Sequence, residues 1–288
     1  MLAQTHHKII QYAYLMRLHR PIGIFLLLWP TMWALWIASR GVPCLNLVFV
    51  FVMGVIMMRS AGCVVNDFAD RHIDGYVART RMRPLATGRV TTTEAILLAI
   101  TLTLMAFLLV LTCNMLTIML SLVGGVLAVV YPFLKRLTNL PQIGLGLAFS
   151  WGVPMAFAAQ MGYIDGAAWF LFITAVIWPL IYDTMYAMAD REDDIRIGVK
   201  SSAIFLNSMD TVVIGLLQSL FIVMLVIVGL MHRLDFPFYF STIIVALFFT
   251  YQQWLIKDRD PSNCIRAFLN NNWVGITIFL GIVLSYKL

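Results

Sequence analysis

The sequence predicts an all-α polytopic membrane protein: one domain over residues 1–288, with nine transmembrane helices around a central cavity open to the cytoplasmic side and to the lipid. Two observations predict this class. Of the 288 residues, 61% are hydrophobic and only 12% are charged, whereas soluble domains average about 25% charged residues. In addition, nine apolar stretches are long enough, or nearly so, to cross about 30 Å of hydrocarbon. No linker or low-complexity run divides the chain.

The nine expected spans follow one another from close to the amino terminus. The first, at about 21–39, follows basic residues as a secretory signal would. It is longer than a typical signal core and eight more spans follow, so we expect it to be retained. The others are expected at about 45–65, 94–112, 115–133, 141–160, 167–188, 208–230, 237–256 and 270–287. Connections on one side are short, as at 112–114, so neighbouring helices should form antiparallel hairpins.

The basic residues indicate which side of the membrane each connection occupies. Sixteen Lys and Arg residues fall on the side of the amino terminus, against Arg40, Arg233 and Lys287 on the other. Because cytoplasmic connections are enriched in Lys and Arg, we expect the amino terminus and the long polar segments in the cytoplasm. Those segments are 66–93, 189–207 and 257–269. The net charge of +6 reflects this bias better than it reflects nucleic-acid binding.

Two acidic clusters lie at the cytoplasmic ends of the second and sixth expected spans, and they hold eight of the fourteen acidic residues. Residues four apart share a helix face, so each cluster forms a stripe of oxygen ligands. The first acidic ladder is Asn66, Asp70 and Asp74, and the second is Asp190 and Asp194 with Asp183 two turns earlier. Carboxylates this close together need a cation. Mg²⁺ suits two facing ladders because it prefers a few carboxylates together with phosphate oxygens.

Basic residues interleaved with the acidic ladders point to an anionic substrate. They are Arg79, Arg81 and Arg83 after the first ladder, Lys135 and Arg136 at the end of the fourth span, and Arg191 and Lys200 after the second ladder. Carboxylates that hold metal beside Arg and Lys are typical of a diphosphate site. A single Arg here would be explained more simply as a topology signal, but the group favours the functional interpretation.

Arg59 is the one basic residue inside an expected span. It lies seven residues before Asn66 and shares its helix face, and an intramembrane Arg without a functional partner would be costly. Aromatic residues are expected around the cavity, where their faces could shelter a carbocation. They are Phe25, Trp29, Trp33, Tyr131, Phe149, Trp151 and Tyr186. Each of these, taken alone, is better explained by packing or as an interface anchor.

These motifs resemble those of the UbiA superfamily of intramembrane aromatic prenyltransferases. The resemblance rests on NDxxDxxxD at 66–74, DxxYAxxD at 183–190 and YxxxK at 131–135, and it extends over the whole chain. The sequences RSAGCVVNDFADR at 59–71 and YDTMYAMADREDD at 182–194 look most similar to the bacterial branch that prenylates 4-hydroxybenzoate. That branch implies a bacterial inner-membrane location and a step in ubiquinone biosynthesis.

The resemblance implies a Mg²⁺-dependent transfer of a polyprenyl group to the ring carbon of 4-hydroxybenzoate ortho to the phenol. Asn66 and Asp70 would bind one Mg²⁺, and Asp190 and Asp194 the other. The partners would be a polyprenyl diphosphate, 4-hydroxybenzoate and the lipid bilayer. We expect no nucleic acid and no obligate protein partner.

Other residues take roles from the same resemblance. Arg83 and Lys135 would hold the diphosphate. Asp67, Asp74, Asp183 and Asp193 would support catalysis by ordering ligands or loops, and Arg59 is also expected in the catalytic set. Further substrate contacts are expected from Tyr131, Tyr186 and Arg79. The acceptor carboxylate needs a cation, and the sequence does not choose among Arg20, Arg59 and Arg136. The base that takes the ring proton, the prenyl chain length and the oligomeric state are also left open.

Two alternatives remain at this point. A UbiA-type enzyme could act on another aromatic or quinone-precursor acceptor, because pocket shape and not motif selects the acceptor. An ion-coupled transporter or cation channel belongs to a different class. Transporter sites usually lie near the bilayer midplane, often with broken helices. The acidic ladders lie instead at the cytoplasmic ends, among Arg residues that would repel a permeating cation.

Overall fold

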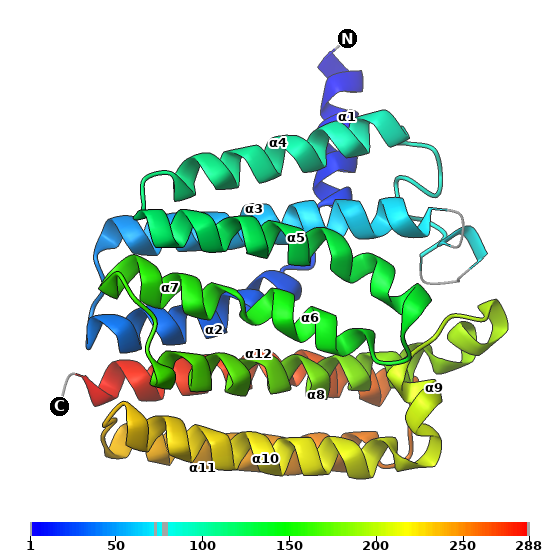
Figure 1. The fold of residues 1–288 in the computed structure, drawn as a ribbon. Coiled ribbons are helices and arrows are strands. Elements are labelled where there is room, and N and C mark those ends of the chain that lie inside the picture. The colour runs from blue at the N-terminus through cyan, green and yellow to red at the C-terminus, as the bar shows by residue number, and fades with distance from the viewer. Residues whose placement is uncertain (1, 72–73, 77–79, 287–288) are drawn as a thin grey trace.

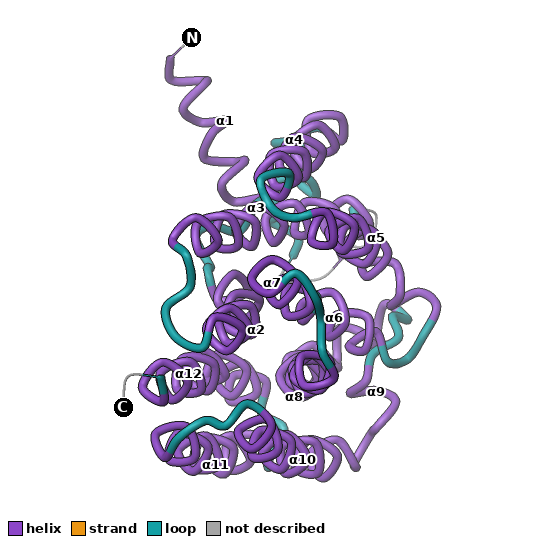
Figure 2. The backbone as a smooth tube through the Cα atoms, turned by 60° about the vertical axis from the view of Figure 1, so that its left-hand side comes forward, coloured by secondary structure: helices purple, strands orange, loops and turns teal. Residues whose placement is uncertain are grey.

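The computed structural model describes residues 2–71, 74–76 and 80–286, and these contain helices and loops but no strand (Figure 1) (Figure 2). The helices are α1 (Leu2–Leu15), α2 (Ile22–Ser39), α3 (Leu45–Asp70), α4 (Thr92–Val110), α5 (Met115–Leu137), α6 (Pro141–Ser150), α7 (Gly152–Met161), α8 (Gly166–Ile197), α9 (Ser202–Leu206), α10 (Asp210–Met231), α11 (Phe236–Ile256) and α12 (Pro261–Ser285). Two 3₁₀ turns, η1 (Asp74–Tyr76) and η2 (Asn207–Met209), complete the described elements.

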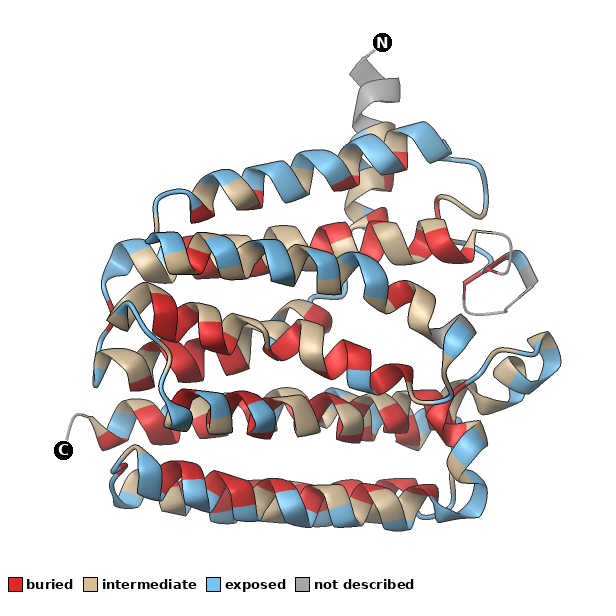
Figure 3. Ribbon diagram, in the orientation of Figure 1, coloured by how far each residue is buried: buried red, intermediate tan, exposed pale blue. Residues whose placement is uncertain are grey.

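Nine segments of the described chain are long and apolar enough to cross a membrane. Helices α6 and α7 together form the fifth, and α9, η2 and α10 together form the seventh. The long helices lie side by side (Figure 1). Exposed residues follow the outer faces of α4 and α10 (Figure 3), and they include Leu104, Leu108 and Leu216. The expected all-α fold with nine spans is confirmed.

Several helices continue beyond the apolar segments that predict them. Helix α3 continues to Asp70 and α8 continues to Ile197, so most of both acidic ladders is helical. Helix α12 starts at Pro261, so the expectation of a start near 270 and of a polar connection over 257–269 is wrong. The Asp260 carboxylate accepts a hydrogen bond from the Asn263 backbone N–H at 2.9 Å. This cap, with Pro261 at the first position, starts the helix within polar sequence.

A helix that the sequence reading did not predict, α1, precedes the first span and runs crosswise to the bundle (Figure 1). Lys8 and Tyr12 of α1 both donate hydrogen bonds to Glu94 at the start of α4, at 2.8 and 3.1 Å. Leu15 is fully buried against the bundle. These contacts hold α1 beside the end of the bundle at which α3 finishes, and they bring the following Arg17 to the same place.

The fifth span is broken at Trp151, between α6 and α7. Pro154 has no N–H to donate to the Ser150 carbonyl, so the helical hydrogen-bond ladder is interrupted there. The Trp151 indole N–H donates to the Leu120 carbonyl at 2.8 Å, which fixes its ring against α5. A β-carbon on Gly152 would overlap the Thr31 hydroxyl, so α7 lies close against α2.

Aromatic side chains pack α2 and α8 against α12. The Trp33 indole N–H donates to the Gly275 carbonyl at 3.0 Å, and that of Trp29 donates to Asn272 at 2.9 Å. The Trp178 ring lies 5.2 Å from that of Trp33, and both are fully buried. Trp29 and Trp33 therefore belong to the core, and the expectation that they line the cavity is wrong.

Replacing Gly275 with alanine should destabilise the bundle. A β-carbon there would overlap the Trp29 ring and lie 2.8 Å from the Trp178 ring. Overpacking of a well-packed core costs about 1–3 kcal/mol. We expect a lower thermal unfolding midpoint in detergent for Gly275→Ala. The control is Gly166→Ala, because no atom lies within 4 Å of a β-carbon at Gly166. Equal midpoints for the two variants would contradict this packing.

Candidate active site

A cavity of about 1210 Å³ lies at the end of the bundle where α3 and α8 finish. Asn66 and Asp70 line it from α3, and Asp190 and Asp194 line it from α8. The two acidic ladders therefore face one common space, although more than a hundred residues separate them in the chain. Oxygen ligands from two helices surround a volume large enough for a small charged molecule.

Most of the other residues expected at a site line the same cavity. They are Asp67, Asp74, Asp183, Asp193, Arg20, Arg59, Arg83, Tyr131 and Tyr186. Arg79 lies outside the described residues, and Lys135 and Arg136 end α5 with side chains that are not among those described. Lys200 lines the cavity as well, whereas Arg81 is exposed and is not part of the lining.

Asp74 does not continue the first ladder on the helix. Helix α3 ends at Asp70, and Asp74 begins the η1 turn. The Asp74 carboxylate accepts hydrogen bonds from Arg83 Nη1 at 2.8 and 2.9 Å, and its carbonyl accepts one from the Thr80 hydroxyl at 2.9 Å. Burial raises the pKa of Asp74, and the Arg83 guanidinium partly offsets this rise. Asp74 therefore binds Thr80 and Arg83, which lie in the loop that follows η1, and does not extend the stripe.

Asp67 joins the start of the bundle to the same loop. Its carboxylate is almost fully buried, and its Oδ1 lies 2.6 Å from Arg17 Nη2 and 3.1 Å from Arg83 Nη1. Breaking a buried ion pair leaves an unpaired charge, which is strongly destabilising. Arg17, Asp67, Arg83 and Asp74 thus form one connected set, which we call the loop ion cluster. It holds the α1–α2 connection and the loop after α3 beside the first ladder.

Arg191 is held away from the cavity. Its guanidinium donates to the Asp210 carboxylate and to the carbonyls of Ala203 and Asn207. The same fully buried carboxylate is 2.9 Å from Arg259 Nη2. Arg191 does not line the cavity, so the expectation that it contributes to a diphosphate site is wrong. The pairing instead ties the end of α8, and with it the second ladder, to the start of α10.

Arg59 lies deeper in the bundle than the first ladder. Because a helix rises 1.5 Å per residue, its position seven residues before Asn66 places it about 10 Å further in. Its guanidinium carbon is 5.4 Å from the centroid of the Phe149 ring, a cation–π contact. A β-carbon on Gly23 would overlap the guanidinium, so the absence of a side chain there makes room for it.

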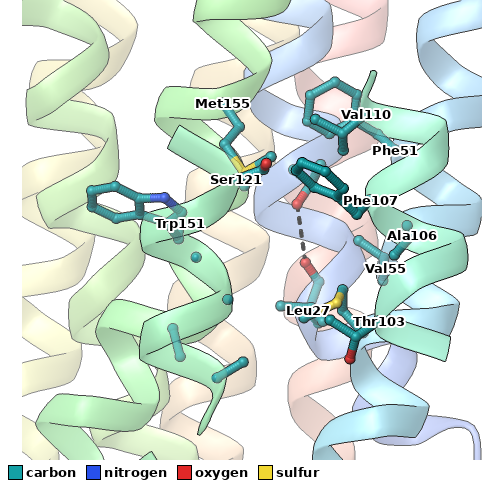
Figure 4. A pocket seen from close by; sticks show the side chains of 18 of the residues that line it. Leu27, Phe51, Val55, Thr103, Ala106, Phe107, Val110, Ser121, Trp151 and Met155 are labelled. Atoms are coloured by element: carbon teal, nitrogen blue, oxygen red, sulfur yellow. Dashed lines mark hydrogen bonds between the residues drawn. The ribbon is translucent and has the colours of Figure 1, made fainter. Parts of the chain in front are cut away.

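A second, apolar cavity of about 340 Å³ adjoins the first. Arg59, Tyr131 and Phe149 line both. Helices α2, α3, α4, α5, α6 and α7 surround the second cavity, with Phe107 and Met155 among its walls (Figure 4). The polar space at the end of the bundle thus continues into an apolar one within the membrane-spanning part.

Glycines line part of the apolar cavity. Gly54 and Gly62 of α3 and Gly125 of α5 all contribute to its wall. No atom lies within 4 Å of a β-carbon built at any of the three. A larger side chain at these positions would therefore extend into open space and narrow the cavity.

Arg17 and Tyr182 were missed by sequence reasoning. Arg17 was used only as one of the basic residues that indicate the orientation of the chain in the membrane. Its partner Asp67 is 50 residues away, so no local sequence pattern links the two residues. Tyr182 lines the cavity from α8, eight residues before Asp190. The position of a tyrosine within an apolar span does not show whether its side chain lines a cavity or packs in the core.

Comparisons with known proteins agree with this architecture. A family model described as the UbiA prenyltransferase family matches residues 27–279. A 4-hydroxybenzoate octaprenyltransferase from Coxiella burnetii is 53% identical over 280 residues, which cover 97% of this chain and 98% of that protein.

Solved structures share the fold. A UbiA homolog from Aeropyrum pernix K1 gives a TM-score of 0.79 at 24% identity, over 91% of this chain and 97% of that one. A UbiA homolog from Archaeoglobus fulgidus bound to GPP and Mg²⁺ gives 0.73 at 16% identity, over 95% and 99%. The sequence matches over nearly the full length, together with this shared fold, show that the chain belongs to the UbiA prenyltransferase family.

Proposed function

We propose that the protein transfers a polyprenyl group from a polyprenyl diphosphate to 4-hydroxybenzoate, at the ring carbon ortho to the hydroxyl, and releases diphosphate. This is a step of ubiquinone biosynthesis. The main support for this proposal is the arrangement of the two cavities. A cavity lined by two acidic ladders adjoins an apolar cavity, and Arg59, Tyr131 and Phe149 line both. The full-length similarity to a 4-hydroxybenzoate octaprenyltransferase supports the choice of acceptor.

The two ladders fit Mg²⁺ by the chemistry of their donors. No group of three or more His, Cys, Asp or Glu side chains that could hold a metal is found among the described residues. At the end of each helix, two residues one turn apart offer oxygen ligands, Asn66 with Asp70 and Asp190 with Asp194. Mg²⁺ is typically bound by one or two carboxylates plus substrate phosphates, so diphosphate oxygens would complete each site. Bound there, Mg²⁺ stabilises the negative charge that develops on the departing diphosphate.

Cationic side chains would hold the diphosphate from the other sides. Lys200 and Arg83 line the cavity, and Arg83 Nη1 lies 3.1 Å from Asp67 Oδ1 and 2.8 Å from Asp74 Oδ2. A guanidinium has five N–H donors in a fixed fork, so Arg83 can keep these pairs and still donate to a phosphate. We assign Lys135 to the same role from its motif. Asp67 and Asp74 position Arg83.

Arg59 is the cation we assign to the acceptor carboxylate. It is deeper than Asn66 and Asp190, it lines both cavities, it contacts Phe149, and Gly23 leaves room for it. Arg20 also lines the polar cavity. Among the arginines whose side chains the structure describes, Arg59 is the one that lines both cavities from inside a span, where an ionisable group marks a functional site.

The apolar cavity would take the first part of the isoprenoid tail. It extends along α3 from Gly62, past Arg59, to Gly54. Its walls are mostly apolar, which suits burial of a hydrocarbon chain. Excluding water from this region also protects a reactive allylic cation from hydrolysis.

Orientation in the membrane follows from charge. We propose that the end of the bundle with the acidic ladders faces the cytoplasm of a bacterial inner membrane, because the Lys- and Arg-rich connections lie at that end. Both the polar substrates and Mg²⁺ would then reach the cavity from the cytoplasmic side.

Removal of metal or of one ladder carboxylate should stop the reaction. Purified protein with a polyprenyl diphosphate, 4-hydroxybenzoate and Mg²⁺ should yield 3-polyprenyl-4-hydroxybenzoate by mass spectrometry, and EDTA should abolish the product. Asp70→Asn or Asp190→Asn should lower turnover about 100-fold or more, the loss typical when a group that stabilises developing charge is removed.

The matched control is Asp258→Asn, an exposed carboxylate outside the cavity, which should keep normal turnover. Near-normal turnover of either ladder variant would rule out the two-metal assignment. Metal-dependent release of diphosphate without prenylated product would show that the site is right and the acceptor wrong.

A narrower apolar cavity should restrict the protein to isoprenyl diphosphates with shorter chains. Gly54 lies twelve residues before Asn66, about 18 Å along α3, and a leucine there would extend into open space. We expect Gly54→Leu to lower kcat/KM for octaprenyl diphosphate about tenfold or more, on the order of the discrimination that a few methylene groups give in an apolar pocket. Turnover of geranyl diphosphate should be kept.

Ser219→Leu adds similar bulk on the exposed face of α10 and serves as the control. It should leave both donors unaffected. Equal loss for the short and long donors in Gly54→Leu would show that this cavity does not hold the tail.

A further inference from the structure

Tyr182 of α8 is a buried residue whose hydroxyl has no hydrogen-bond partner among the described residues. Its side chain is 1% exposed. Buried polar groups are nearly always hydrogen-bonded, because an unpaired one loses its interactions with water and gains nothing in return. Tyr182 nevertheless lines the polar cavity, so a molecule bound in that cavity would be able to accept a hydrogen bond from its hydroxyl.

The Tyr182 ring is held in one position. It lies edge-on to Trp178 at 5.4 Å and to Phe268 at 5.9 Å between ring centroids. Trp178 is itself fixed, because its indole N–H donates to Asn271 at 3.0 Å. A hydroxyl held this way is a preorganised donor, which loses little conformational entropy when a ligand binds.

Tyr182 and Arg59 lie at matching depths on the two helices that carry the ladders. Tyr182 is eight residues before Asp190, and Arg59 is seven residues before Asn66. At 1.5 Å per residue, these offsets are about 12 and 10 Å. Both residues line the polar cavity, so a ligand group at that depth can meet both.

The chemistry of the acceptor decides which of its ends reaches that depth. The carbon that forms the new bond is adjacent to the phenol, and the diphosphate that leaves lies at the ladders. The phenol end of the ring therefore faces the ladders, and the carboxylate, para to it, points deeper. A carboxylate has about four acceptor positions, and a guanidinium fork satisfies two of them. In an apolar setting the rest need donors as well.

We infer that the Tyr182 hydroxyl donates a hydrogen bond to the carboxylate of the bound aromatic acceptor, beside Arg59. This rests on the proposed function. Tyr182 is thus an acceptor-binding residue, and it contributes to the preference for an acidic ring over a neutral one.

The test is Tyr182→Phe, which removes only the hydroxyl. Because no described residue forms a hydrogen bond with that hydroxyl, the variant should be at least as stable as the parent without ligand. The KM for 4-hydroxybenzoate should rise about tenfold, as expected for a lost hydrogen bond to a charged group. The KM for the polyprenyl diphosphate and the kcat should stay within about twofold of the parent values. The control is Tyr163→Phe at an exposed tyrosine between α7 and α8, which should change nothing.

Two further readouts separate the outcomes. For methyl 4-hydroxybenzoate, which lacks the anionic charge, parent and Tyr182→Phe should differ little. Without any prenyl donor, 4-hydroxybenzoate should raise the thermal midpoint of the parent more than that of the variant. An unchanged KM and an equal thermal shift would overturn the inference, and so would a loss confined to kcat or to the donor. Absence of product from the parent protein would instead refute the proposed function.

Discussion

The cost of burying charge at the end of a membrane bundle is the constraint on which the site depends. Carboxylates removed from water must be paired or hydrogen-bonded, and two sets of ion pairs meet this need here. The loop ion cluster neutralises Asp67 and Asp74 with Arg17 and Arg83. Asp210 is paired with Arg191 and Arg259 at the other ladder. The first set joins the α1–α2 connection to the end of α3, and the second joins the start of α10 to the end of α8.

These ion pairs explain how the helix ends that carry the ladders are held in place. The pairs of Asp67 and Asp210 fix the ends of α3 and α8, and Asn66, Asp70, Asp190 and Asp194 line the common cavity between these ends. Sites built on helices hold their geometry better than sites built on loops. The two ladders therefore keep their relative position by packing and ion pairs that lie outside the proposed metal sites.

The polarity of the residues that line the two cavities changes with depth along the bundle. Asn66, Asp70, Asp190 and Asp194 line the cavity at the end of the bundle. Arg59, Tyr182 and Asp183 lie about two turns further in, and the apolar cavity extends along α3 from Gly62 past Arg59 to Gly54. An allylic diphosphate has the same order of parts: a charged head, a reactive carbon and a hydrocarbon tail. Each part of the donor would therefore meet residues of matching polarity, and water would be kept from the reacting carbon.

Sequence alone determined the membrane fold, the helical ladders and the family resemblance, because hydropathy and helix periodicity are local properties. It could not determine which charges pair. Arg17 and Asp67 are 50 residues apart, and Arg191 lies beside a ladder residue yet binds Asp210 on another helix. Nor did it separate Trp29 and Trp33, which pack α2 against α12, from aromatic residues that line a cavity. Which face of a helix meets a neighbour and which meets a cavity depends on the packing of all the helices, so only the tertiary structure decided these roles.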